Sequence, residues 1–181
     1  MNIKHFLGLL ISFSLLFACS KKKEVKTQNS KANLSSSPMH VEALFVCDEL
    51  DSITTKRIEN WKEYFVLKKF LRVYKKISPR VALYNAVELK ELTKKVKDSS
   101  RVSNLQTPAF RARVNVFENE VLRLADMVQI PSISADEVNF QVKKIFLAFG
   151  SLNTKIIHTF RKESFDDSVK VAKLNQKNLD F

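Results

Sequence analysis

The fold of this chain is decided by residues 107–156, which read TPAFRARVNVFENEVLRLADMVQIPSISADEVNFQVKKIFLAFGSLNTKI. Each half of this stretch repeats apolar residues at alternating spacings of four and three, the heptad period of helices that pack along a seam. The first seam comprises Phe110, Val114, Phe117, Val121, Leu124 and Val128, and the second comprises Val138, Val142, Ile145, Phe149, Leu152 and Ile156. A short connection joins the seams, so the sequence predicts two antiparallel helices that share a core.

Start and stop signals bound both predicted helices. Thr107 is a helix cap followed by Pro108, a residue favoured at the first position of a helix. Pro131 ends the first helix, because a proline disfavours helical geometry in the residue before it. Ser134 and Glu137 lie three residues apart ahead of the second seam, which is the pattern of a capping box.

Two further helices are predicted upstream of this pair. The first spans residues 52–77, and Pro79 ends it and opens the next, which runs to about residue 97. A short leading helix is also expected within residues 39–50. The apolar faces comprise Trp61, Tyr64, Phe65, Leu67, Phe70, Leu71 and Tyr74 in the first helix, and Ala82, Leu83, Ala86, Leu89 and Val96 in the second.

The composition favours the same architecture. The 181 residues include 2 Gly and 4 Pro, whereas sandwiches, barrels and doubly wound sheets need many Gly- and Pro-containing turns. We therefore expect an all-α protein, with one up-and-down antiparallel four-helix bundle over residues 39–163. The tail over residues 164–181 is more polar, and its structure is left open.

The N-terminus has the three parts of a signal peptide. Lys4 and His5 provide a short positive region, and an apolar run over residues 6–17 follows. That run is too short for a helix that crosses a bilayer core of about 30 Å. Residues 16–19 read LFAC, and the polar sequence SKKK begins directly after Cys19.

The LFAC stretch resembles the lipobox of bacterial lipoproteins, in which Leu, any residue and a small residue precede Cys. The resemblance implies that residues 1–18 are cleaved as a signal peptide, and that Cys19 is diacylated on sulfur and acylated on its new amine. Phe17 is bulkier than the common residue at its position. The alternatives are an ordinary signal peptide or an N-terminal membrane helix with a chance cysteine.

Residues 19–38 are expected to form the lipid anchor and a flexible tether, because they contain almost nothing to bury. Ser20, rather than Asp, follows the cysteine, which favours the outer membrane, with the bundle facing the periplasm. The stretches LYNA at 83–86 and LRLADM at 122–127 resemble small helical lipoproteins of Bacteroidetes that have no assigned activity. That resemblance implies location and fold but no reaction.

The net charge of +12 indicates possible partners. In an exported protein, this excess points to anionic lipid head groups, lipopolysaccharide or an acidic envelope protein rather than to nucleic acid. The charge is equally compatible with no specific partner. The membrane, through the lipid anchor, is the one partner expected directly, and the oligomeric state is left open.

No pattern of a catalytic, metal or cofactor site is recognisable. The histidines are His5, His40 and His158, and none follows a glutamate by three as in di-iron bundles. No Cys-x-x-Cys-His, Gly-x-Ser-x-Gly or Gly-rich phosphate loop occurs. With Cys19 lipidated, Cys47 has no intramolecular disulfide partner, and we expect it to be buried and inert. We therefore expect no enzyme, no cofactor and no metal.

Carboxylate pairs on the predicted helices are a weaker sign of catalysis. Glu88 with Glu91, or Glu118 with Glu120, could be imagined as acid and base, but such pairs are usually solvated or matched with Lys and Arg.

The candidate partner-binding residues are Arg111, Asn115 and Glu118, which recur at spacings of four and three beside the first seam. The alternative is an exposed flank with an internal salt bridge. Together these features predict a non-enzymatic cell-envelope lipoprotein that serves as a helical interaction or scaffold module. The alternative function is a periplasmic bundle that senses or binds a small molecule between its helices.

Overall fold

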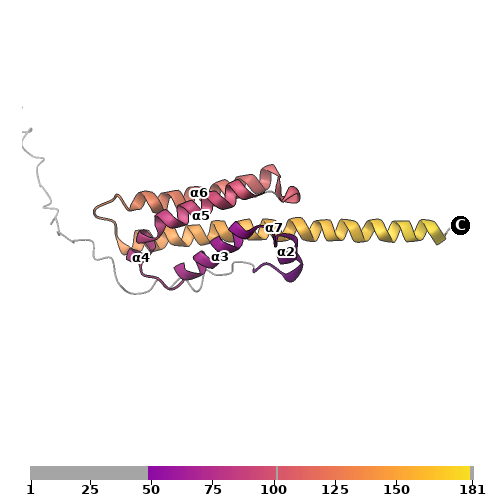
Figure 1. Ribbon diagram of the computed structural model, residues 1–181, viewed down its shortest axis with the longest axis horizontal. Coiled ribbons are helices and arrows are strands. Elements are labelled where there is room, and N and C mark those ends of the chain that lie inside the picture. Colours follow the sequence, from indigo (N-terminus) through magenta and orange to yellow (C-terminus); the bar gives the residue numbers. More distant parts are fainter. Residues whose placement is uncertain (1–48, 101, 180–181) are drawn as a thin grey trace, which may run out of the picture. The chain divides into compact units, whose positions relative to one another are not determined.

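The computed structural model describes residues 49–100 and 102–179, and every regular element in these ranges is a helix (Figure 1). The helices are α2 (Ser52–Arg57), α3 (Lys62–Tyr74), α4 (Pro79–Tyr84), α5 (Ala86–Ser99), the 3-10 helix η3 (Ser103–Leu105), α6 (Pro108–Met127) and α7 (Ala135–Leu179). The all-α class predicted from the sequence is therefore confirmed. The predicted signal peptide, the predicted lipidation site Cys19, the predicted tether, nearly all of the predicted leading helix over 39–50, and Cys47 lie outside the described residues.

One hydrophobic core holds these helices together. Helix α6 packs against α7, α5 packs against α6, and α3 packs against α5, while the shorter α2 and α4 both contact α7. Buried aromatic rings fill the centre: Tyr64 of α3 and Phe117 of α6 both contact Phe149 of α7, with ring centroids 5.9 and 5.5 Å apart. Tyr64 also donates its hydroxyl to Asn153 Oδ1 at 2.8 Å, so the core's central tyrosine is bonded as well as packed.

The two predicted seams form the interface between α6 and α7. All six residues of the second seam are buried, as are the first five of the first seam. Val128 was predicted to belong to the core, but its side chain is 44% exposed. Val128 is the C-cap residue that follows the last residue of α6, Met127, so it lies at the very end of the seam.

Two helices expected to be continuous are broken. The segment predicted as one helix over 52–77 is divided by a turn at residues 58–61, and the segment over 79–97 is divided at Asn85. In both cases the two parts have different main neighbours. Helix α2 packs mainly on α7, whereas α3 packs mainly on α5; helix α4 packs mainly on α7, whereas α5 packs mainly on α6 and α3. A straight helix would have to follow one direction, so these different main contacts favour the breaks.

The predicted caps are present and explain where α6 and α7 begin. Thr107 Oγ1 accepts a hydrogen bond from the Phe110 amide at 3.2 Å. At the start of α7, the Ser134 amide donates to Glu137 Oε2 at 2.9 Å, and the Glu137 amide donates to Ser134 Oγ at 3.3 Å. These reciprocal bonds are a capping box, and the hydroxyl and amide of Ser134 hold the pKa of the Glu137 carboxyl below its usual value.

Helix α7 continues through the segment whose structure the sequence left open, and Figure 1 shows its C-terminal part running on past the other helices. Phe160 is the last core residue of α7. Beyond it Phe165, Val171 and Leu174 are 67%, 56% and 62% exposed. This part of the helix therefore gains little from core packing.

Removal of the last turns of α7 is expected to have little effect on the bundle. A chain that stops after Val169 loses described side chains that are exposed, so the free energy of unfolding should change by less than about 1 kcal/mol. Urea unfolding followed by circular dichroism measures this change. A loss of several kcal/mol would mean that the C-terminal turns pack against something in the folded protein.

Candidate functional site

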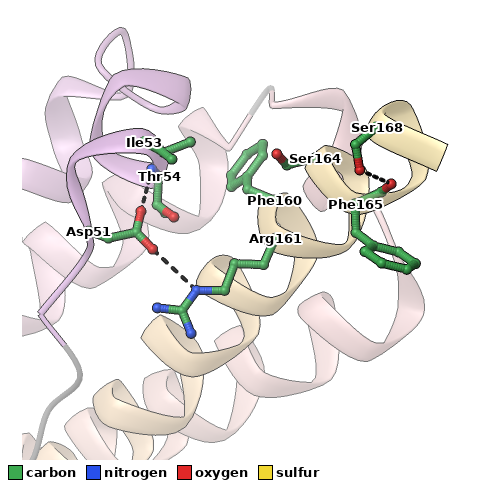
Figure 2. A pocket seen from close by; sticks show the side chains of 8 residues that line it. All are labelled: Asp51, Ile53, Thr54, Phe160, Arg161, Ser164, Phe165 and Ser168. Atoms are coloured by element: carbon green, nitrogen blue, oxygen red, sulfur yellow. Dashed lines mark hydrogen bonds and ion pairs between the residues drawn. The ribbon is translucent and has the colours of Figure 1, made fainter. Parts of the chain in front are cut away.

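A pocket of about 340 Å³ opens between the start of α2 and the C-terminal half of α7 (Figure 2). Its lining comprises Asp51, Ile53 and Thr54 from the α2 side, and Phe160, Arg161, Ser164, Phe165 and Ser168 from α7. The volume is at the lower end of the range for small-molecule pockets, roughly 300–1,000 Å³. The lining combines apolar rings, hydroxyl groups and one ion pair, which is the chemistry of a site for a small amphipathic molecule.

The ion pair between Asp51 and Arg161 joins the two sides of the pocket. Asp51 Oδ1 caps α2 by accepting from the Thr54 amide at 2.7 Å, and Asp51 Oδ2 accepts from Arg161 Nε at 3.3 Å. The Thr54 amide is the main reason that the pKa of Asp51 lies below its usual value, and the Thr54 hydroxyl and the Arg161 guanidinium add to the effect. Both carboxylate oxygens are thus engaged within the protein.

Thr54 is buried beside the Asp51 carboxyl. Its side chain is 1% exposed, and its interaction with Asp51 helps to lower the pKa of that carboxyl. Figure 2 places Thr54 beside Asp51 on the α2 side, across from Phe160 and Arg161. The polar groups at the start of α2 therefore interact with each other within the protein.

A second candidate surface is the outward face of α3, which we call the cationic stripe. It comprises Lys62, Val66, Lys69 and Val73 of α3 together with Lys76, two residues past the end of the helix, and all five are exposed. Within the described part of the chain, none of its three lysines forms an ion pair. The one acidic residue of α3, Glu63, lies off this stripe.

The three residues predicted to bind a partner all lie on α6, but they differ in their exposure and in their contacts. Arg111 and Asn115 are exposed, whereas Glu118 is partly buried. Glu118 Oε2 accepts from Lys97 Nζ on α5 at 2.6 Å. The contact ties α5 to α6, and nothing in the described geometry joins the three residues into one site.

The carboxylates considered for catalysis either pair with neighbouring side chains or are exposed to solvent. Glu120 pairs with Arg123 at 3.2 Å and accepts from Gln141 Nε2 at 2.8 Å, while Glu88 and Glu91 are exposed on α5. His158 is exposed on α7. Among residues 49–100 and 102–179, no group of three or more His, Cys, Asp or Glu side chains is arranged to hold a metal ion.

Sequence reasoning missed the pocket, because its two sides are more than a hundred residues apart in the chain. A local sign did exist: Asp51 followed by SIT is a helix-capping sequence, which marks where α2 begins. Nothing in the sequence says that α7 lies opposite. The helices of the described ranges were also searched for a membrane span, and none is long and apolar enough to be one.

Comparisons with known proteins do not extend these findings. No model of a protein family matches the chain, and neither the curated proteins nor the solved structures include a significant match. The function must therefore be argued from the residues themselves.

Proposed function

We propose that this protein is a non-enzymatic, lipid-anchored module of the cell envelope, and that its cationic stripe rests on anionic lipid head groups. The observation that carries the proposal is the stripe itself: on α3, the exposed Lys62 and Lys69 alternate with the exposed Val66 and Val73, and the exposed Lys76 follows just past the end of the helix. We further propose that α3, α5, α6 and α7 act as an up-and-down four-helix bundle, with α2 and α4 as short extensions.

The chemistry of the stripe suits a lipid surface better than water alone. Val66 and Val73 are 53% and 52% exposed, although valine gains from leaving water. Lysine side chains next to them can bury their methylene stems while the ammonium groups reach phosphate oxygens. Near an anionic leaflet each lysine contributes on the order of 1 kcal/mol, and no acidic side chain on the stripe opposes that contact.

The proposed anchor would supply the proximity that a weak contact needs. The predicted tether of about twenty residues after Cys19 would have a reach of roughly 25 Å as a random coil. At that distance from the membrane, the effective concentration of lipid is high. The stripe would therefore bind lipid even if its affinity for a single head group is weak. We place the protein in the outer membrane, facing the periplasm, as the sequence after Cys19 favours.

A spin label tests whether the stripe touches lipid. Val66→Cys is labelled in the lipidated chain carrying Cys47→Ser, and the protein is placed in vesicles with or without phosphatidylglycerol. With this anionic lipid, we expect collisions of the label with a water-soluble nickel chelate to fall several-fold. The effect should disappear at 1 M salt, where the Debye length is about 3 Å.

Two matched controls make the result specific. A label at Val87, a 59% exposed valine on α5, should show no such protection. Lys62→Gln, Lys69→Gln and Lys76→Gln together should abolish protection at Val66. The same charge change on α5, Lys90→Gln, Lys94→Gln and Lys95→Gln, should leave it intact. Equal accessibility of the labels at Val66 and Val87 in anionic vesicles would overturn the proposal.

A further inference from the structure

We propose that the C-terminal extension of α7, residues 161–179, pairs with the same segment of a second copy of the chain as an antiparallel coiled coil. The inference is independent of membrane contact by α3. Three observations carry it. The extension runs past the other helices (Figure 1), one of its faces is an uncharged stripe with heptad spacing, and charges of opposite sign lie beside that stripe.

The extension is long for a helix without a neighbour. It continues for about 28 Å after Phe160, the last core residue of α7, at the usual helical rise. Arg161 bonds to α2, and Glu163 bonds to α2 and η3, but both residues precede the uncharged stripe. A helix of this length is marginal in water by itself, because most helices in proteins are stabilised by packing of one face. A second helix would supply that packing.

The uncharged stripe, which we call the terminal stripe, comprises Phe165, Val169, Ala172 and Gln176 at alternating spacings of four and three. Val169 is half-buried and the other three are exposed, with 67% of Phe165 accessible to solvent. The stripe has no charged member, although residues 163–173 include three acidic and two basic side chains. Covering its apolar side chains with a second helix would gain free energy.

The charges beside the terminal stripe favour a second copy in antiparallel orientation. Asp166 and Lys173 lie on the same side of the stripe, one heptad apart, and neither forms an ion pair within the described part of the chain. When Val169 of each copy packs against Ala172 of the other, Asp166 of each copy lies beside Lys173 of the other. The two-fold symmetry of such an interface forms this charge pair twice, and pairs of this kind set the orientation of coiled coils.

The rest of α7 disfavours a parallel pair. Towards the bundle, the heptad positions of the terminal stripe are continued by Lys162, His158, Lys155, Ser151 and Lys144. Two parallel copies would bring these lysines together along the helix, where like charges repel. An antiparallel pair overlaps only in the extension, so each terminal stripe meets another uncharged one.

Distances between spin labels test the pairing. The lipidated full-length chain with Cys47→Ser is labelled at Lys170→Cys or at His158→Cys in detergent micelles, and dipolar coupling is measured as the protein concentration rises. The chain with Cys47→Ser alone should take up no label. An antiparallel pair centred near residue 170 places the labels at 170 nearly level, and those at 158 about 38 Å apart along the helix axis. The proposal is overturned if no coupling develops at 170, or if the distance at 158 is no longer than that at 170.

Charge reversal tests the orientation separately. Asp166→Lys should weaken dimerisation at least about fivefold in sedimentation equilibrium, because two exposed charge pairs are replaced by repulsion. Adding Lys173→Asp to the same chain should restore the affinity. Asp167→Lys makes the same charge change on the opposite side of the helix, also at an exposed position, and should leave the affinity unchanged. Equal weakening by Asp166→Lys and Asp167→Lys, or no rescue, would contradict the antiparallel pair.

A truncated chain provides the monomer reference. The chain that stops after Val169 lacks Ala172, Lys173 and Gln176, so it should stay monomeric at concentrations where the parent chain dimerises. Its free energy of unfolding is compared with that of the parent chain at a dilution where both are monomeric, so that the bundle alone is measured. Dimerisation of the truncated chain as strong as that of the parent chain would place the contact elsewhere and overturn the inference.

Discussion

The substitution Cys19→Ala is expected to abolish acylation and to release the protein from the membrane fraction. The thiol of Cys19 is the atom that the predicted lipobox would present for diacylation, and alanine has no group that can carry a thioether. Each buried acyl methylene contributes about 0.8 kcal/mol to the free energy of membrane binding. The loss of the acyl chains therefore removes most of the free energy that holds the protein on the membrane. Labelling with radioactive palmitate, followed by membrane fractionation, measures both consequences.

Cys47→Ala is the matched control, because it removes the only other thiol of the chain. It should still incorporate palmitate and stay in the membrane fraction. Palmitate incorporation by Cys19→Ala at the level of the parent chain would contradict the lipoprotein prediction. It would also remove the anchor from the proposed function.

The substitution Phe117→Ala is expected to cost about 3–5 kcal/mol of unfolding free energy, a large share of what a domain of this size has. Phe117 is fully buried, and its ring lies 5.5 Å from that of Phe149 across the α6–α7 interface. Removing the ring loses the free energy gained from burying it. It also leaves a cavity between α6 and α7, because the surrounding side chains keep the two helices from closing the gap. Urea unfolding monitored by circular dichroism gives the value.

Phe140→Ala provides the comparison, since it removes the same ring from a 59% exposed position on α7. Phe140 contacts the Lys144 ammonium at 4.9 Å, an exposed interaction of about 0.5–1 kcal/mol. Its loss should therefore cost about 1 kcal/mol or less. Similar costs for Phe117→Ala and Phe140→Ala would mean that the α6–α7 seam is not the core of the protein in solution.

Much of the fold was predictable because it depends on local periodicity. The heptad spacing selects one face of each helix for burial, and Val138 through Ile156 follow that rule at every seam position. Helix starts were predictable for a related reason. A cap bonds to amides within three residues of itself, so Thr107, Ser134 and Glu137 act within their own stretches of sequence.

The candidate sites were less predictable. Arg111, Asn115 and Glu118 share a helical face, but whether a shared face becomes a site depends on the helix packed beside it. Helix α5 places Lys97 against Glu118 and leaves Arg111 and Asn115 to solvent. The cationic stripe of α3 follows the same spacing rule and could have been read from sequence, had the exposed face been known.

The sequence by itself determined the helical class, the two seams and the caps, because each depends on residues close together in the chain. Only the tertiary structure decided the breaks at residues 58–61 and at Asn85, where the segments on either side pack mainly on different helices. It also decided the pocket, which requires Thr54 to lie opposite Phe160. The physical reason is that local propensity is similar for a straight and a broken helix, so contacts between distant segments decide which one forms.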